Sequence, residues 1–177
     1  MKKLSMEALN RLSPTAFSAT EKLPLVLVLD NVRSGMNVGS VFRTADAFAL
    51  EKIILCGITA VPPHREILKT ALGSTETVPW EQYEQTAQAI KQLKAEGYKV
   101  YAVEQISDKT WLQDFNPEPG EKYALVFGNE VDGVADPVLH ACDGAVEIPQ
   151  FGTKHSLNIA VAAGIVVWEI SRKVRSS

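Results

Sequence analysis

The alternation of strand and helix patterns along the chain constrains its fold more than any other feature of the sequence. Residues 25–29 are apolar without interruption, which is typical of a strand covered on both faces. The following residues carry an apolar side chain every three or four positions and predict a helix with the buried stripe Val38, Val41, Phe42, Ala45 and Phe48. Because this alternation recurs to the end of the chain, we expect an α/β fold with a mostly parallel sheet and helices on both faces.

The same patterns give expected boundaries for each element. We expect strands at residues 25–29, 52–56, 99–103, 122–127 and 145–148. We expect helices at residues 37–50, 65–72, 81–96, 136–142 and 156–173. Residues 23–177 would form one domain behind an N-terminal extension, residues 1–22, which is too short for a core of its own.

The expected last helix is apolar almost all round. Its small residues, Ala160, Ala162, Ala163 and Gly164, lie among large apolar ones. Such a helix must be buried on most sides, and small side chains let another backbone approach closely. Burial in the core alone is the simpler explanation. We favour a helix shared between the core and a subunit interface, and therefore expect a homodimer.

The composition is that of an ordinary globular protein. The chain has 177 residues, 46% of them hydrophobic and 22% charged, which is enough for a substantial core. We expect no secretory leader, and the longest apolar stretch, residues 159–168, is too short to span a bilayer. Cys56 and Cys142 have no disulfide or metal spacing and should be buried, reduced thiols. We therefore expect a cytoplasmic protein that does not enter a membrane.

Three segments rich in glycine, asparagine and serine follow expected strands and indicate a ligand site. They are residues 30–46, 127–134 and 148–158. In open α/β sheets ligands bind beyond the carboxyl ends of the strands, where such loops present backbone N–H and C=O groups. Ordinary turn chemistry would explain one of these loops, but three of them favour a shared site.

Signatures of other enzyme classes are missing from these loops. The first loop does not form the dinucleotide fingerprint, and the second lacks the Lys-Ser/Thr pair of a phosphate-binding loop. His64, His140 and His155 have no metal-ligand spacing, so we expect no metal. His155 stands beside Ser156, but no elbow motif or orienting acid accompanies the pair, which disfavours a hydrolase.

Together the three loops resemble motifs one, two and three of the SPOUT methyltransferases, in particular the SpoU (TrmH) branch. The resemblance runs from about Pro24 to Lys173. The matching positions are Asn31 and residues 37–43 in the first motif, residues 128–130 and Gly133 in the second, and Ile148, Pro149 and residues 156–158 in the third. The chain departs from the family pattern at Met36, where proline is frequent, and at Ala49, where glycine is frequent. Both departures concern turn geometry.

The resemblance implies a C-terminal trefoil knot that forms the pocket for S-adenosylmethionine. True knots are nearly absent among folds, so general packing rules would not have predicted it. By the same resemblance, the residues expected to hold this methyl donor are Val103, Glu104, Phe127, Gly128, Asn129, Gly133, Ile148, Leu157 and Asn158.

The resemblance also implies that the chain methylates a ribose 2′-hydroxyl, and that Arg43 takes the hydroxyl proton. A guanidinium stays protonated, so we favour electrostatic stabilisation of the developing alkoxide together with a phosphate clamp. Glu130 should orient Arg43 as a paired, buried carboxylate. Asn37, Ser156 and Asn158 should position the ribose and phosphate, although helix capping or loop structure is a competing role for each.

RNA recognition must come from local basic groups, because the net charge is −3 and phosphate neutralisation usually provides affinity. On the domain, the residues expected to contact RNA are the polar Asn31 and the basic Arg33, Arg43, Arg65 and Lys69. The basic candidates near the chain ends are Lys2, Lys3, Arg11, Arg172, Lys173 and Arg175. Low charge favours a compact folded target read by shape, and hence tRNA over rRNA.

Two other functions are compatible with such a chain. One is a non-catalytic RNA-binding or ribosome-assembly factor on the same scaffold, which the presence of Arg43, Glu130 and Asn158 disfavours. The other is an α/β enzyme that uses a different nucleotide, for which the sequence offers no phosphate loop.

Overall fold

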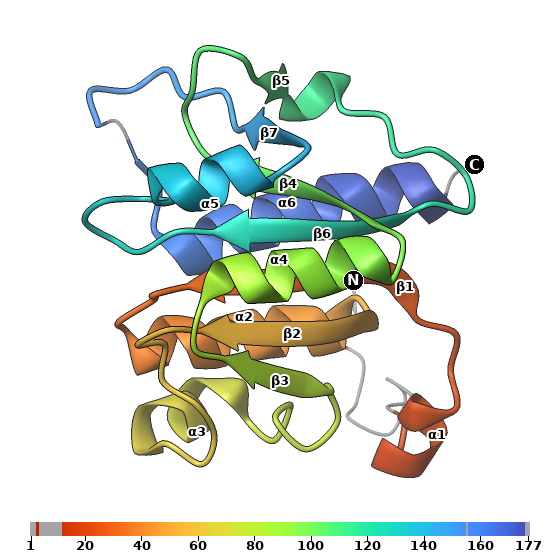
Figure 1. The fold of residues 1–177 in the computed structure, drawn as a ribbon. Coiled ribbons are helices and arrows are strands. Elements are labelled where there is room, and N and C mark those ends of the chain that lie inside the picture. The colour runs from red at the N-terminus through yellow and green to blue at the C-terminus, as the bar shows by residue number, and fades with distance from the viewer. Residues whose placement is uncertain (1–2, 4–11, 155, 176–177) are drawn as a thin grey trace.

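A computed structural model describes residues 3, 12–154 and 156–175 and shows a fully parallel β-sheet between two layers of helices (Figure 1). The seven strands lie in the order β3-β2-β1-β6-β4-β7-β5, and each pairing between them is parallel. The strands are β1 (Leu23–Asp30), β2 (Leu50–Cys56), β3 (Trp80–Tyr83), β4 (Tyr98–Val103), β5 (Thr110–Trp111), β6 (Lys122–Phe127) and β7 (Gly144–Glu147). The expected α/β class is confirmed.

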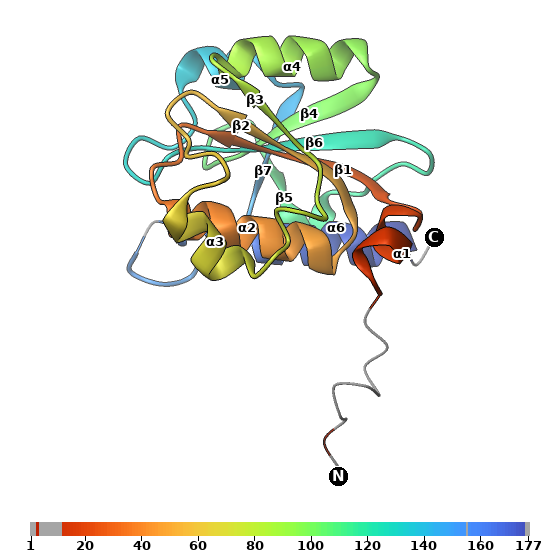
Figure 2. The same cartoon turned by 90° about the horizontal axis from the view of Figure 1, so that it is seen from below.

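The helices divide between the two faces of the sheet, as Figure 2 shows. Helices α4 and α5 cover one face, whereas α2, α3 and α6 lie on the other, with α1 at its edge. The helices are α1 (Pro14–Ser18), α2 (Gly35–Ala47), α3 (Arg65–Ala71), α4 (Thr86–Ala95), α5 (Asp136–Ala141) and α6 (Ile159–Arg175), and a short 3₁₀ helix, η2, spans Leu112–Asp114.

The central strand β1 shows why its sequence is apolar without interruption. Leu25, Leu27 and Leu29 pack into the core cluster formed with α2 and α6. Val26 and Val28 face the other way, into the cluster formed with α4. Both faces of the strand are therefore buried, as expected for a central strand of a parallel sheet.

One expected helix, residues 81–96, is wrong at its start. Residues Trp80–Tyr83 form strand β3, which pairs with β2, and α4 begins only at Thr86. The Thr86 hydroxyl donates to the buried carboxylate of Asp30 at the end of β1, which fixes the start of the helix. Residues 81–85 include several helix formers, but pairing along the edge of β2 outweighs that local preference.

The last helix begins at Ile159, three residues later than expected. The Asn158 side chain accepts hydrogen bonds from the backbone amides of Ala160 and Val161, which is the N-capping pattern. The sequence patterns did not predict α1, β5 or η2, which are short.

Candidate active site

The main cavity lies beyond the carboxyl ends of β4, β6 and β7 and has a volume of about 490 Å³. The second and third glycine-rich loops form most of its wall, with the end of β4 and the start of α6. Its lining residues are Val103, Glu104, Gln105, residues 127–133, residues 146–148, Gln150, residues 156–159 and Ala162. The volume is in the range usual for small-molecule sites.

The nine residues expected to hold a methyl donor all line this cavity, and so do Glu130 and Ser156. Sequence reasoning missed several others, namely Gln105, Val131, Asp132, Val146, Glu147, Gln150, Ile159 and Ala162. Most of these lie between or directly beside the expected residues. Continuity of the loops was the only signal that could have identified them.

The second loop contains a tight turn that tolerates no side chain at Gly128. Gly128 faces the backbone of Gly133 so closely that a Cβ atom there would overlap it. Asn129 and Gly133 exchange two backbone hydrogen bonds of 3.1 Å, and the Asn129 side chain caps the amides of Val131 and Asp132. The loop is therefore a preformed, rigid part of the cavity wall.

Glu104 supports that loop from the end of β4. One carboxylate oxygen accepts from the backbone amide of Val134 at 2.9 Å, and the other accepts from the amide of Gln105 at 2.9 Å. Glu104 thus lines the cavity while holding the second loop against strand β4.

The cavity is acidic. Its lining includes the carboxylates of Glu104, Glu130, Asp132 and Glu147, and no lysine or arginine is among the described residues that line it. Lys109 lies 3.2 Å from the Glu147 carboxylate. The remaining negative charge favours a ligand with a positive centre and disfavours a phosphate group.

A hydrogen-bonded chain joins the first, second and third loops. The Glu130 carboxylate accepts from the backbone amides of Arg33 and Ser34 at 3.3 Å and from the Asn37 side chain at 3.1 Å. Asn37 in turn accepts from the side-chain nitrogen of Asn158 at 3.1 Å. The first loop does not line the cavity, but this chain places the start of α2 beside it.

These hydrogen bonds also set the ionisation of Glu130. Partial burial opposes the charged form, but hydrogen bonds from its own amide, from Asn37 and from the amides of Arg33 and Ser34 outweigh it and lower the pKa of the Glu130 carboxyl. Glu130 is therefore a fixed negative charge at neutral pH. The Glu130 residue is exposed, so the expectation that its carboxylate is buried is wrong.

Arg43 does not meet Glu130. Within the described structure Arg43 makes no ion pair, and it lines a second groove with Ser40, Thr44, Phe48 and Lys69. Arg43 lies nearly two helical turns beyond Asn37 on α2, about 9 Å along the axis. The expected pairing of Arg43 with Glu130 within one protomer is thus wrong, because the start of α2, and not its second turn, faces the second loop.

The other residues expected to contact RNA occupy different environments. Asn31 has a left-handed backbone, and its side chain bonds to Asp30 and to the amide of Ile58, which makes it part of the loop framework. Arg33, Arg65 and Lys69 have exposed side chains. For each of these four residues, RNA contact stays a prediction.

The basic residues near the chain ends divide into two groups. Arg172 pairs with Glu169, Lys173 binds the carbonyl oxygens of Leu112, Gln113 and Phe115, and Arg175 donates to the carbonyl of Phe48. These contacts give the C-terminal cations roles inside the fold. Lys2 and Arg11 lie outside the described residues, and Lys3 is exposed.

Helix α6 is buried on one side only. Ala163, Val166 and Ile170 are in the core, whereas Val161, Ile165 and Trp168 are 52%, 38% and 58% exposed. The spacing of these three exposed residues, four and then three positions apart, makes one apolar stripe along the helix. An exposed apolar stripe of this kind is typical of a protein interface.

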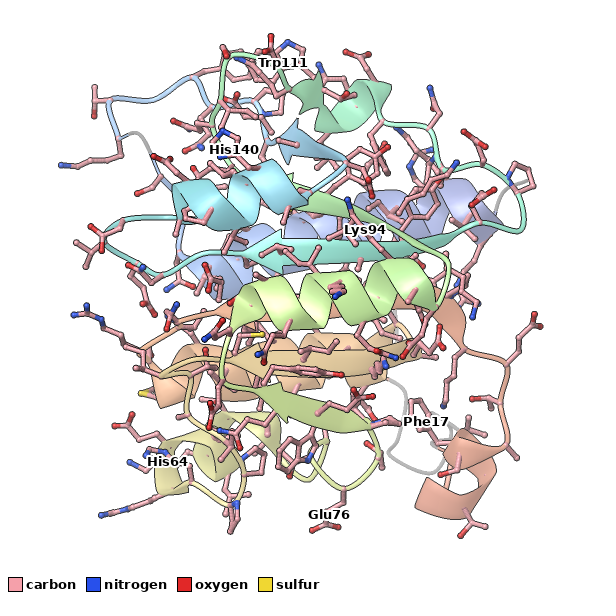
Figure 3. All side chains as sticks on the ribbon, viewed as in Figure 1. Phe17, His64, Glu76, Lys94, Trp111 and His140 are labelled. Atoms are coloured by element: carbon pink, nitrogen blue, oxygen red, sulfur yellow. The ribbon has the colours of Figure 1, made fainter. Side chains whose placement is uncertain are left out.

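The two cysteines and the described histidines offer no reactive centre. Burial raises the pKa of the Cys56 thiol to about 12 and that of the half-buried Cys142 thiol to about 11, so neither is a nucleophile at neutral pH. His64, at the start of α3, and His140, on α5, lie far apart (Figure 3). His155 lies outside the described residues. Among the described residues no group of three potential ligands could hold a metal ion.

No helix in the described part of the chain is long and apolar enough to cross a membrane.

Comparison with known proteins gives consistent matches over most of the chain. Residues 24–168 match the model of the SpoU rRNA Methylase family. The 23S rRNA (guanosine-2′-O-)-methyltransferase RlmB of Neisseria meningitidis is 32% identical over 150 residues, which are 85% of this chain and 59% of that protein. The chain thus spans about three-fifths of the length of the curated relatives that it matches.

Solved structures agree with this comparison. The AdoMet-bound rRNA methyltransferase from Sinorhizobium meliloti superposes with a TM-score of 0.78 at 29% identity, covering 92% of this chain and 61% of that one. A structure described as giving structural insights into the 2-OH methylation of C/U34 on tRNA superposes with a TM-score of 0.77 at 26% identity, covering 88% of this chain and 100% of that one.

Proposed function

Because the chain belongs to the SpoU rRNA Methylase family, we propose that it methylates a ribose 2′-hydroxyl of RNA with S-adenosylmethionine as the donor. The acidic cavity at the ends of β4, β6 and β7 is the observation that carries this proposal. S-Adenosylmethionine has a positively charged sulfonium, which a cavity lined by carboxylates would favour. The same negative charge opposes binding of a phosphate-bearing nucleotide. It therefore disfavours an α/β enzyme that uses another nucleotide, for which the sequence also offers no phosphate-binding loop.

The residues present fit the donor. Phe127, Ile148 and Leu157 offer apolar side chains at the cavity wall, and the backbone of Gly128 lines the same wall, where main-chain polar atoms would read the edge of a base. When bound, S-adenosylmethionine would supply the methyl group. The residues of the cavity would hold the donor and orient its methyl group toward the ribose 2′-hydroxyl, which would give up its proton to solvent.

Arg43 is the proposed catalytic residue. Its guanidinium stays protonated, so its contribution is electrostatic stabilisation of the negative charge that develops on the 2′-oxygen. Asn37 and Asn158 already bond to each other beside the cavity, and with Ser156 they would position the ribose and its phosphate.

Arg43 would act in the site of a partner subunit. It lies outside the donor cavity of its own protomer, in a groove whose wall includes Phe48. The Phe48 ring packs edge-on against Trp168, 6.1 Å away between ring centres, so this groove borders the exposed stripe of α6. A symmetric homodimer formed through that stripe would bury its apolar residues and bring Arg43 close to the partner.

We favour tRNA over rRNA as the substrate. The net charge of −3 argues against extended binding to a large RNA surface and supports a compact target recognised by its shape. Tritium transfer from labelled donor to purified tRNA and, separately, to rRNA is the measurement. Label in rRNA alone would overturn this preference and leave the chemistry intact.

Donor binding and catalysis can be tested separately. Calorimetry should detect binding of S-adenosylmethionine in the presence of a chelator, and absence of binding at millimolar donor would refute the proposed function. Arg43→Ala should keep donor affinity and lower methyl transfer by about 100-fold or more. Lys91→Ala, on the opposite helical layer, is the matched control and should change neither quantity. Donor binding without transfer to any RNA would instead favour a non-catalytic RNA-binding factor.

A further inference from the structure

Some lysine and arginine side chains of this protein form ion pairs with carboxylates, and others do not. Lysines 52, 94, 99 and 109 each pair with a carboxylate within 4 Å. Other described cations, Arg33, Lys91, Lys122 and Lys154, also make no ion pair, but they lie apart on different segments. Arg43, Arg65 and Lys69 make no ion pair in the described structure and lie together on the adjoining helices α2 and α3. On a chain of net negative charge, unpaired cations collected on one face indicate a binding surface for anions.

Helices α2 and α3 are in close contact near Gly39, and a groove lies between them further along α2. At Gly39 of α2 the backbone of Ile67 and the side chain of Thr70 come so close that a Cβ atom would overlap them. The Thr70 hydroxyl also donates to the carbonyl of Met36 at 2.9 Å. Further along α2 a groove of about 460 Å³ is lined by Ser40, Arg43, Thr44, Ala47, Phe48, Lys69 and Thr70.

The groove has cations on both walls, Arg43 from α2 and Lys69 from α3. Arg65 lies one helical turn before Lys69 and therefore on the same side of α3. Glu66, the carboxylate of α3, forms no ion pair with either cation in the described structure. The three positive groups thus extend from the groove along α3, and none forms an ion pair with a described carboxylate.

We propose that Lys69 and Arg65 form a phosphate-binding face on α3 that holds the RNA strand next to the nucleotide served by Arg43. The inference deepens the proposed function and rests on it for the nature of the ligand. It assigns the two residues a positioning role, because neither lies at the donor cavity. Since both would bind phosphate, they should contribute to affinity without selecting a base sequence.

The experiment compares Arg65→Gln, Lys69→Gln and the double variant with Lys91→Gln. Lys91 is an exposed lysine on α4, which covers the opposite face of the sheet (Figure 2). Equilibrium binding of purified tRNA and rRNA is measured at several salt concentrations, and donor affinity is measured by calorimetry. Each α3 variant should bind RNA about three- to fivefold more weakly and lower the slope of log K against log salt by about one. Lys91→Gln should resemble the wild type.

Steady-state rates separate positioning from folding defects. The α3 variants should raise KM for RNA, leave kcat unchanged and keep the donor affinity. RNA affinity and salt slope equal to those of Lys91→Gln would overturn the phosphate face even if methyl transfer is observed. A lower dimer mass by light scattering, with unchanged RNA affinity, would also overturn it and assign the face to subunit contact. Wild-type protein that binds RNA through this face but transfers no methyl group would refute the proposed function alone.

Discussion

Replacing Glu130 with glutamine removes the charge that joins the first and second loops. Its Oε2 atom accepts from the amide of Arg33, and its Oε1 atom accepts from the amide of Ser34 and from the side chain of Asn37. A glutamine has one acceptor oxygen and one amino group. Whichever way it is oriented, at least one of these N–H donors loses its partner and faces another donor.

The expected loss of stability follows from the number and quality of these bonds. A hydrogen bond to a charged group contributes about 1.5–3 kcal/mol, but the bonds here are long, at 3.1–3.3 Å, and Glu130 is exposed, which lowers their contribution. We expect Glu130→Gln to lower the free energy of unfolding by about 1–2 kcal/mol. For a chain of this size, that corresponds to a decrease in Tm of roughly 2–8 °C.

The pH dependence gives a sharper test, because the folded state lowers the pKa of Glu130. The stabilisation from a carboxylate with a lowered pKa is complete above its unfolded pKa, about 4.3, and is lost as the pH falls through the folded value. The difference between wild type and Glu130→Gln should therefore be constant from pH 7 to pH 5 and shrink below about pH 4.

Urea unfolding followed by circular dichroism at pH 7, 5 and 3 measures this difference. Asp132→Asn is the matched control, since Asp132 is an exposed carboxylate of the same loop whose side chain accepts no hydrogen bond in the described structure. It should change stability by less than about 0.5 kcal/mol. A Glu130→Gln variant as stable as Asp132→Asn, or a difference unchanged at low pH, would refute the role of Glu130 as a charged link between loops.

Three further changes test other parts of the molecule. Light scattering should give about twice the 19.3 kDa chain mass. If each site uses both subunits, mixing Arg43→Ala with Asn158→Ala subunits should restore about a quarter of wild-type methyl transfer. No recovery would mean that both residues of a site come from one chain. Lys173→Met removes the charged donor from three carbonyl oxygens of residues 112–115 and should cost about 2–4 kcal/mol in urea unfolding, and a loss below 1 kcal/mol would contradict this role. Ala49→Gly should raise Tm by up to a few degrees in calorimetry, because Ala49 has a left-handed backbone, and a lower Tm would show that no strain is relieved.

The two departures from the family pattern, at Ala49 and Met36, can be compared with the local structure at each position. Ala49 stands where glycine is frequent, and the structure shows a φ of 52° there, the region that glycine occupies most easily. The family pattern, and not the alanine itself, thus indicated the turn geometry at this position. Met36, at the other departure, has an exposed side chain.

The α/β class and the location of the donor cavity were accessible from the sequence, because they depend on patterns a few residues long. Alternation of apolar runs and helical spacing requires a covered parallel sheet, and the loops at the carboxyl ends of its strands then meet at one edge. The residues expected around the donor accordingly lie in one cavity. The roles proposed for them, and the knot implied by the resemblance, stay predictions.

Contacts between distant segments were decided by the tertiary structure alone. Periodicity places Asn37 and Arg43 on the same helix but does not determine which turn faces the second loop, and Glu130 bonds to Asn37. The edge strand β3 exists because β2 offers an unpaired edge to residues with mixed local preference. The sequence by itself determined most of the strands, helices and glycine-rich loops, since that information is local, but not the edge strand β3 or the short elements α1, β5 and η2. Which side chains meet depended on the strand order, with β6 between β1 and β4, because that order sets the distances between loops that are far apart in the chain.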